Sequence, residues 1–496
     1  MTNSAGTLCA WSVLSSLAVG LFVLSHTPYC WPVGILVPST MVGLWRAPLV
    51  SQLPIQVIVE SLLIGSLACW LVTPFFAGAV AAYELPVHVI CCMVYSSQTV
   101  GTALVIWSTR SWSVMASAPL IALASTLAEL GHAMAFGITW ITTNAALTMT
   151  TTPVAQWSGV LSPFGLSAAV CWIGCLLWPD WSKSSWRRYV STVTAISALA
   201  ILWVGGLLIE SAIDDRPPAF NALLVQPCLA QGTVSLHTQH LQTLTSLQTD
   251  GKVDLILWGE GAVQGGPYSQ LSQPVETNVD KYDPHIGMTF TRFREQLVHQ
   301  YQTSCLLGAL VGDSLVVRKD GNEYLEDRTY NCGLLVSPYA FVDCHEKIAL
   351  MPVRETSITC LSWLPRLQDW IHSQLGARSF YDPGRNFHPL TFEDRSGKKR
   401  RIAVAICYES WLPWLPQYHC NEPLDAICHL AYDGDFKDHP EYTQRMLLTI
   451  RLRAIETRTW QLVCSHFAGT AVIDPRGRIV KQLPPGPGVL RTDRME

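Results

Sequence analysis

Three polar side chains in the C-terminal half of the chain could do chemistry together, and two of them stand where short apolar runs end. Glu260 lies in WGEGA after the run 253–258, Lys347 lies in CHEKIALMP, and Cys407 directly follows IAVAI. A thiol becomes a good nucleophile only as a thiolate, which needs a neighbouring base or positive charge. Glu260 could supply the base, and Lys347 could supply positive charge for a tetrahedral oxyanion. The three residue types therefore indicate nucleophilic catalysis by a cysteine.

The elements around these residues predict an α/β domain. From about residue 220, short β-branched runs alternate with amphipathic stretches, which is typical of an α/β or αββα fold. We predict strands at 222–226, 253–258 and 401–406, and a helix at 441–457. Reactive side chains at the C-terminal ends of buried strands are the usual way in which such sheets expose chemistry. A single cysteine after an apolar strand is also a common core residue, so each position alone says little.

The first part of the chain has the composition of a membrane domain. Residues 1–189 carry nine formal charges, whereas the other 61 of the 70 charged residues fall in the remaining 307 positions. Soluble domains average about a quarter charged residues. We therefore predict a transmembrane helical domain over 1–212 and a catalytic domain over 218–490. Apolar runs long enough to span a bilayer indicate about seven spans, near 7–25, 29–45, 55–82, 87–107, 113–141, 163–178 and 189–209.

Charge in the connecting loops predicts the orientation of these spans. With a cytoplasmic N-terminus, seven spans place all five basic residues of this part in cytoplasmic loops: Arg46, Arg110, Lys183, Arg187 and Arg188. That distribution obeys the positive-inside rule. The same count places everything after Ile209 outside the cytoplasm, which is the periplasm of a Gram-negative cell.

Several function classes find no support. The net charge of −4 gives no basic footprint for nucleic acid. The 16 cysteines form no CxxC pair and no Cys/His ligand spacing, so neither a zinc site nor another metal or cofactor is expected. Nine cysteines fall in the C-terminal part, and most are interpreted as small buried hydrophobes.

The order of glutamate, lysine and cysteine resembles that of the carbon–nitrogen hydrolase (nitrilase) superfamily and, within it, the apolipoprotein N-acyltransferase family. The glutamate motif matches VDLILWGEGAV at Glu260, and the lysine motif matches KIALMPVRE with Lys347 and Glu355. The cysteine motif matches VAICYES, with Cys407, Tyr408 and Glu409. Further similar segments are AELGHAMAFGITW, VAQWSGVLSPFGLS, LLVQPCLAQG and the stretch that begins RLRAIETRTW, so the resemblance covers nearly the whole chain.

The sequence also departs from the family's pattern. Gly259 stands where the family usually has proline before the glutamate. The segment YDGDF keeps Asp433 and Phe436 but has Asp435 in place of tryptophan, and SHFAG replaces an asparagine-rich segment. The final membrane span that is usual in the family has no counterpart near Glu496. These changes leave the acyl donor and acceptor open.

The resemblance implies a membrane-bound N-acyltransferase of the bacterial inner membrane, with an αββα nitrilase-like catalytic domain. Cys407 would take an acyl chain from a phospholipid as a thioester and pass it to an amine, such as the N-terminal cysteine of a lipoprotein. Glu260 would be the base, and Lys347 with the backbone N–H of Tyr408 would stabilise the oxyanion. Glu355 and Glu409 would hold these groups in place, although Glu409 could equally be a structural carboxylate.

Three alternatives stay open at this point. The chain could be a membrane-anchored amidase or hydrolase of the same superfamily, such as a relative associated with conjugative transfer. It could be an inactive scaffold, against which stands the retention of all three reactive residue types. A transporter would account for the membrane part and leave the C-terminal domain unexplained.

Overall fold

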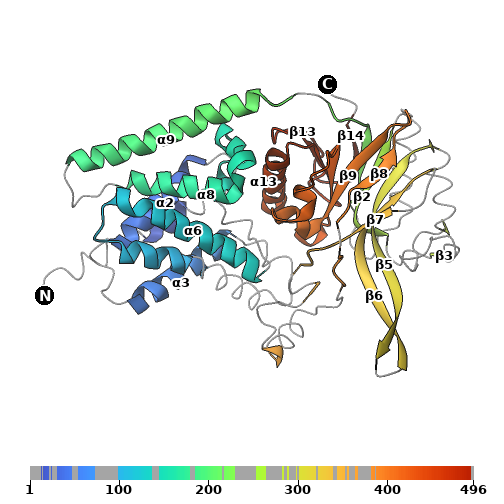
Figure 1. Ribbon diagram of the computed structural model, residues 1–496, viewed down its shortest axis with the longest axis horizontal. Helices are drawn as coiled ribbons and strands as arrows, with labels where there is room; N and C mark the ends of the chain where they lie inside the picture. Colours follow the sequence, from blue (N-terminus) through green and yellow to red (C-terminus); the bar gives the residue numbers. More distant parts are fainter. Residues whose placement is uncertain are drawn as a thin grey trace. The chain divides into compact units, whose positions relative to one another are not determined.

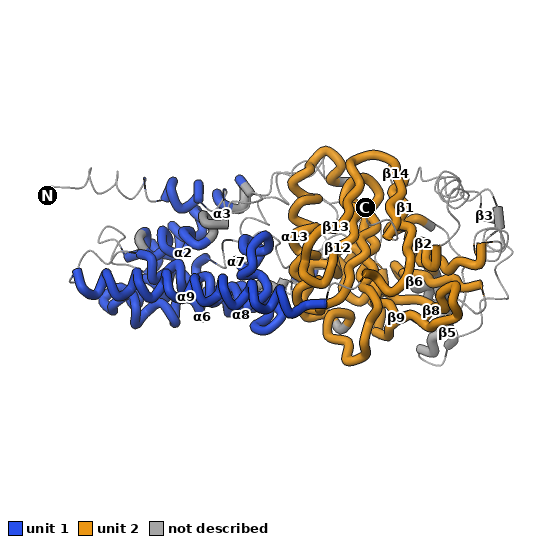
Figure 2. Tube along the Cα trace, turned by 90° about the horizontal axis from the view of Figure 1, so that it is seen from above, with its two compact units in different colours: residues 1–214, 358–368 blue, residues 215–357, 369–496 orange. Residues whose placement is uncertain are grey.

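The structure, a computed structural model, divides into two compact units, residues 1–214 with 358–368 and residues 215–357 with 369–496 (Figure 2). It describes residues 13, 15–21, 24, 31–46, 54–72, 96, 99–136, 145–178, 185–214, 217–228, 253–263, 282–283, 288–289, 298, 301–319, 322–338, 343–351, 355–356, 364–366, 381–385 and 387–492.

The first unit is helical. Its described elements are α2 (Trp31–Arg46), α3 (Pro54–Val72), α6 (Val114–Phe136), α7 (Ala145–Thr148), η1 (Pro153–Trp157), α8 (Ser158–Leu177) and α9 (Ser185–Ser211) (Figure 1). Among the described residues, three stretches are long and apolar enough to cross a membrane: Val114–Gly131, Pro153–Leu177 and Ser185–Ser211. They overlap the predicted spans 113–141, 163–178 and 189–209. The bundle of seven spans is not confirmed, because most of 7–25 and much of 87–107 lie outside the described residues.

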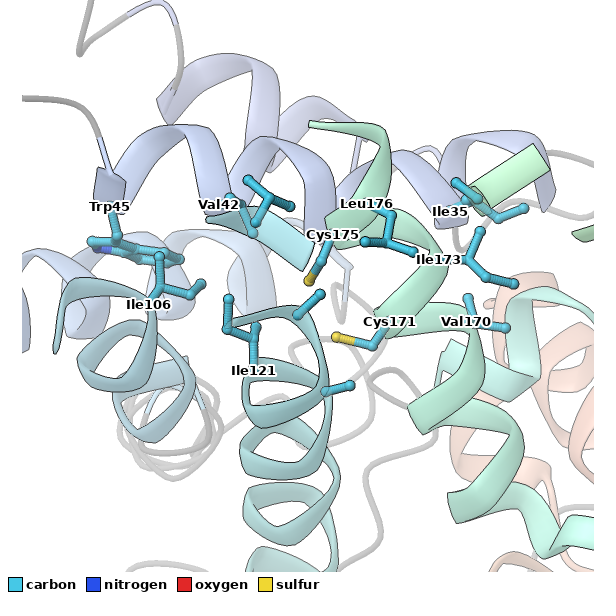
Figure 3. Packing of buried hydrophobic residues seen from close by; sticks show 14 of the residues in the cluster. Ile35, Val42, Trp45, Ile106, Ile121, Val170, Cys171, Ile173, Cys175 and Leu176 are labelled. Atoms are coloured by element: carbon cyan, nitrogen blue, oxygen red, sulfur yellow. The ribbon is translucent and has the colours of Figure 1, made fainter. Parts of the chain in front are cut away.

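Apolar side chains both fill this unit and cover its outside. Val42 and Trp45 of α2 pack in one buried cluster with Ile121 of α6 and Cys175 of α8 (Figure 3). The approach of α2 to α8 is close, since a Cβ on Gly174 would lie 2.4 Å from the carbonyl oxygen of Ile35. Large apolar side chains are also exposed along the helices, among them Leu63, Leu127, Ile201 and Leu208. Apolar residues on both sides of a helix are typical of a segment that faces protein on one side and lipid on the other.

The second unit contains two six-stranded mixed sheets. The first has the order β14-β1-β2-β5-β6-β7, and its strands are β1 (Ala222–Gln226), β2 (Leu255–Val263), β5 (Ser304–Lys319), β6 (Asn322–Val336), β7 (Asp343–Glu346) and β14 (Gly488–Arg491). Strands β1, β2 and β5 run parallel, and β14, β6 and β7 are antiparallel to their neighbours. A separate two-stranded sheet joins β3 (Tyr282–Asp283) to β4 (Met288–Thr289).

The second large sheet has the order β13-β12-β11-β10-β9-β8. Its strands are β8 (Leu390–Glu393), β9 (Lys399–Ile406), β10 (Ala426–Leu430), β11 (Gln461–Cys464), β12 (Ala471–Ile473) and β13 (Ile479–Gln482). Parallel β9, β10 and β11 form its centre. Single-turn helices η5 (Cys407–Trp411), η6 (Pro416–Tyr418) and η7 (Gly434–Phe436) follow strands β9 and β10, and α13 (Pro440–Thr457) precedes β11.

The inner faces of the two sheets share one core. Leu224 and Leu257 of the first sheet are fully buried in the same cluster as Val404, Cys428 and Leu462 of the second. Central parallel strands buried on both faces explain the continuous apolar runs in the sequence.

The structure confirms most of the predicted elements of this unit and corrects one. The strands at 222–226 and 401–406 and the helix at 441–457 are confirmed, as is the α/β fold with two sheets. The strand predicted at 253–258 begins two residues later, at Leu255, and continues to Val263, so that it carries Glu260 within it.

Candidate active site

Glu260 lies on an irregular part of β2. The strand pairs with β5 up to Trp258, which lies opposite Leu307, and resumes at Val263, which lies opposite Ala309. The extra residues on one side form a bulge, a device that re-aims side chains at the edge of a regular ladder. Glycine is needed on the neighbouring strand, since a Cβ on Gly308 would lie 2.2 Å from the carbonyl oxygen of Gly259.

Cys407 lies at the junction of β9 with the single turn η5. Its φ of 48° falls in the left-handed region, which is rare for a residue with a side chain. Such strain is characteristic of functional sites, where the surrounding structure enforces it. Ile406 and Tyr408 on either side are buried, whereas Cys407 is partly exposed. The turn therefore holds Cys407 between two buried neighbours that anchor its backbone.

Lys347 is buried between two carboxylates. It directly follows β7 and has 1% of its side chain exposed. Its Nζ lies 3.3 Å from Oε1 of Glu260 and 2.8 Å from Oε2 of Glu355. The amide N–H of Met351 also donates to Glu355, at 2.7 Å. A buried ammonium requires such partners, so the two glutamates and the lysine hold one another in place.

Asn331 of β6 is a member of this cluster that the sequence did not reveal. Its Nδ2 donates to Oε1 of Glu260 at 2.8 Å and to Oε1 of Glu355 at 3.2 Å. Its carbonyl oxygen accepts from the backbone N–H of Lys347 at 2.8 Å. The one available sequence signal was an amide side chain inside an otherwise apolar strand, TYNCGLLV.

Glu409 connects the segment after Lys347 to the strand end that precedes Cys407. Its fully buried carboxylate accepts hydrogen bonds from the backbone N–H groups of Ile348 at 2.7 Å, Ala349 at 3.2 Å and Ile406 at 2.9 Å. His345 Nε2 lies 3.1 Å from the same carboxylate. Glu409 therefore joins the backbone that follows Lys347 to the backbone that precedes Cys407.

The charges of the cluster act on one another. Burial raises the pKa of the Cys407 thiol, the carboxylates of Glu260 and Glu355 raise it further, and Lys347 opposes them. Burial alone would lower the pKa of Lys347, but Glu260 and Glu355 raise it above its ordinary value. Burial would raise the pKa of Glu409, yet His345 and the backbone donors bring it below its ordinary value. Lys347 and Glu409 are therefore charged at neutral pH, and the Cys407 thiol is protonated.

Two of the sequence departures lie in contact with each other. A Cβ on Gly259 would lie 2.8 Å from Cδ2 of His466, which belongs to the SHFAG segment. Asp433 of the YDGDF segment accepts hydrogen bonds from the backbone N–H groups of His466, Phe467 and Ala468. The side chain of Asp435 lies outside the described residues. The altered segments thus form one connected layer beside the glutamate bulge.

A chain of buried hydrogen bonds connects the turn that carries Cys407 to strands β10 and β11. Ser410 Oγ lies 2.8 Å from Nδ1 of His429, and Nε2 of His429 lies 2.7 Å from Oε1 of Gln461. The amide oxygen can only accept, so Nε2 carries the ring proton and Nδ1 accepts from the serine hydroxyl. Burial lowers the pKa of His429 to about 4, so the ring is neutral at physiological pH. In the neutral form both ring nitrogens have a hydrogen-bond partner, and the bond to Ser410 holds the turn that carries Cys407.

The arrangement is equipped for nucleophilic acyl chemistry. It joins a thiol on a strained turn, a carboxylate near enough to that thiol to raise its pKa, and a buried cation. These groups match a nucleophile, a base and an oxyanion donor. Within the part of the chain that the structure describes, no group of three or more His, Cys, Asp or Glu side chains could hold a metal ion.

The sequence is similar to those of known proteins. The chain is 24% identical over 304 residues to apolipoprotein N-acyltransferase 2 of Treponema denticola, which covers 57% of this chain and 50% of that protein. It is 23% identical over 317 residues to the apolipoprotein N-acyltransferase of Chlorobaculum tepidum, covering 60% of this chain and 54% of that protein. It thus spans about half the length of the curated relatives that it matches. These matches confirm the resemblance to apolipoprotein N-acyltransferases.

Comparison with solved structures and with protein families concerns the second unit. An amidase from a Nesterenkonia species matches at 14% identity and a TM-score of 0.35, covering 56% of this chain and 91% of that one. Residues 224–494, more than half of the 496, match the family described as Carbon-nitrogen hydrolase. The chain therefore belongs to the carbon-nitrogen hydrolase family.

Proposed function

We propose that this protein is a membrane-bound N-acyltransferase that moves an acyl chain from a phospholipid, through a thioester on Cys407, to an amine. The N-terminal cysteine of a lipoprotein is the acceptor that the similarity to apolipoprotein N-acyltransferases favours. The observation that carries the proposal is the convergence of Glu260, Lys347 and Cys407 in one chain with three helices apolar enough to cross a membrane. In this proposal residues 1–212 are the membrane domain and residues 218–490 the catalytic domain.

The first half-reaction forms the thioester. Glu260 takes the proton of Cys407, and the thiolate attacks the ester carbonyl carbon of the phospholipid. Negative charge then develops on the carbonyl oxygen, where Lys347 and the backbone N–H of Tyr408 stabilise it. The intermediate collapses as Glu260 returns the proton to the glycerol oxygen. Lysophospholipid leaves, and the acyl chain remains on the sulfur.

The second half-reaction transfers the acyl chain. The acceptor amine attacks the thioester carbonyl and gives a proton to Glu260, and the same oxyanion donors act again. The carbon–sulfur bond breaks, the thiolate regains a proton, and an amide leaves. Glu355 and Asn331 hold Lys347 and Glu260 in register through both steps.

Attachment to a membrane suits these substrates. Moving a 16-carbon chain from lipid into water costs roughly 12 kcal/mol, at about 0.8 kcal/mol for each methylene. A site that opens at the bilayer surface avoids most of that cost. This argument favours an acyl transferase over a soluble-type amidase as the activity of a chain with such helices.

The proposed location is the inner membrane, with the catalytic domain on the periplasmic side. Arg46 donates to the carbonyl oxygens of Thr109 and Trp112, each at 3.3 Å, so Arg46 and the loop that holds Arg110 lie at the same end of the first unit. This agrees with the placement of both arginines in cytoplasmic loops. We expect reporters fused after residue 212 to be active in the periplasmic format only. Activity confined to the cytoplasmic format would reverse the topology.

The test of the function follows the acyl group. The purified full chain in detergent is incubated with a phospholipid and a diacylglyceryl-cysteine peptide. We expect mass spectrometry to detect an acyl adduct on the peptide that contains Cys407, followed by an N-acylated acceptor. The alternative, a membrane-anchored amidase or hydrolase, would release free fatty acid, or ammonia from small amides, and leave the acceptor amine unmodified. That result would overturn the proposal.

A further inference from the structure

A histidine outside the catalytic cluster contacts the main chain that carries Glu260. Nε2 of the fully buried His466 lies 2.9 Å from the carbonyl oxygen of Glu260. A carbonyl oxygen can only accept, so Nε2 carries the ring proton and donates it. The bond reaches the bulge of β2 itself, where the ladder to β5 is interrupted and the usual strand pairing does not fix the backbone.

His466 is itself held firmly. The carboxylate of Asp433 accepts from the backbone N–H groups of three successive residues, His466 at 3.1 Å, Phe467 at 2.8 Å and Ala468 at 2.8 Å. On its other side the carbonyl oxygen of His466 accepts from the N–H of Cys228 at 2.7 Å. The histidine therefore connects a rigid loop to an irregular strand segment.

Gly259 makes room for this contact. A Cβ at position 259 would lie 2.8 Å from Cδ2 and 3.0 Å from Nε2 of His466, and 3.0 Å from the carbonyl oxygen of Ala431. Contacts under 3.0 Å require something to shift, and a ring that shifts loses its hydrogen bond to the carbonyl oxygen of Glu260. The imidazole and the glycine thus form a matched pair, in which the ring occupies the space that a side chain at 259 would need.

Burial also sets the charge of the ring. It lowers the pKa of His466, although Asp433 and the carbonyl group of Glu260 oppose it. The charged groups that face this region are Asp433 on the loop after β10 and Glu260 on β2. The neutral ring with a proton on Nε2 is a donor aimed at the bulge.

We infer that His466 is a positioning residue, which fixes the backbone of the β2 bulge so that the carboxylate of Glu260 is aimed at Cys407 and Lys347, and that Gly259 is required to seat it. The inference rests on the proposed role of Glu260 as the base. It gives a role to residues that contact the backbone of Glu260 and not the reacting groups themselves. Asp433 acts in the same layer by holding the loop of His466.

The experiment measures iodoacetamide labelling of Cys407 against pH in the full chain in detergent, by mass spectrometry of the Cys407 peptide. No acyl donor or acceptor is needed. We expect His466→Phe to shift the labelling curve in the same direction as Glu260→Gln, with a change of roughly tenfold at neutral pH, the size expected when one hydrogen bond is lost. His466→Gln, whose amide N–H can reach the same carbonyl, should restore most of the wild-type rate. A merely structural role would not be rescued in this way.

The glycine supplies an independent arm. Gly259→Ala should change labelling severalfold in the wild-type background and much less in the His466→Ala background, where the clash with the ring is gone and only the 3.0 Å approach to the carbonyl oxygen of Ala431 remains. Gly20→Ala is the matched control, since a Cβ there meets nothing within 4 Å. The comparison of Gly259→Ala in the wild-type and His466→Ala backgrounds tests the role of His466 even if His466→Phe does not fold. Equal effects of Gly259→Ala in both backgrounds would overturn the inference.

The outcomes separate this inference from the proposed function. An unchanged curve in His466→Phe beside an altered curve in Glu260→Gln would refute the role of His466 alone. An unchanged curve in Glu260→Gln would refute the base, and the inference with it. Altered curves in both, in a protein that transfers no acyl group, would leave the positioning role standing and refute the acyltransferase.

Discussion

Replacing Cys407 by alanine should abolish the acyl adduct and all acyl transfer while the protein remains folded and inserted. The sulfur forms the covalent bond in the proposed mechanism. The next three residues of the turn, Tyr408, Glu409 and Ser410, are buried, so none of them offers a substitute nucleophile. Cys407→Ser should fail as well, because a hydroxyl is far less acidic than a thiol. Loss should exceed a thousandfold, since the whole covalent route is removed. Intact-mass and peptide analysis after exposure to phospholipid is the measurement.

Cys420→Ala is the matched control for this substitution. Cys420 is another partly exposed free thiol of the same unit, and it lies outside the cluster of Glu260 and Lys347. The control variant should form the adduct at the wild-type rate. Persistence of an acyl adduct in Cys407→Ala, or its loss in Cys420→Ala, would move the nucleophile away from Cys407.

Loss of Lys347 should slow acylation by about a hundredfold to a thousandfold, the effect of removing one donor to an oxyanion. Lys347→Met removes the cation but leaves Glu260 and Glu355 buried together without a positive partner, which destabilises the fold. The double variant Lys347→Met/Glu355→Gln removes the excess charge and should fold while acylating as slowly. Lys399→Met, the same change at an exposed lysine, is the control. Rates of adduct formation near those of wild type in the double variant would exclude Lys347 from the oxyanion site.

Glu260→Gln gives an outcome whose sign is informative. As a fixed negative charge, Glu260 raises the pKa of the Cys407 thiol, so removing it should speed alkylation at neutral pH. As a general base, Glu260 takes the thiol proton, so removing it should slow alkylation. We expect slowing, larger than in Lys347→Met and absent in the exposed control Glu393→Gln. Labelling as fast as wild type, or faster, would mean that Glu260 is not the base.

The sequence pointed to Glu260, Lys347 and Cys407 but not to the residues that hold them in place. The apolar runs that end near Glu260 and Cys407 located two elements correctly, because strands buried on both faces must be continuously apolar. Asn331 and His466 escaped notice because each acts across strands distant in sequence, and no local pattern encodes such a contact. The extension of β2 through Glu260 was missed for a similar reason, since a bulge depends on the neighbouring strand, and on Gly308 in particular. The count of seven spans stays a prediction, since hydropathy alone gives soft boundaries where Pro38 and Pro74 interrupt the runs.

The position of β14 beside β1 has a bearing on how this unit is made. Leu223 of β1 lies opposite Arg491 of β14, and the N–H of Ala222 donates to Thr492, 270 positions later in the chain. Contacts of such long sequence separation form slowly, because a large loop must close before they stabilise anything. During synthesis one edge of β1 therefore stays unpaired until β14 has left the ribosome. Unpaired strand edges can pair with other chains. The first sheet is completed only once β14 has been made, after every other described strand of the unit, so its closure is the last strand pairing that synthesis allows.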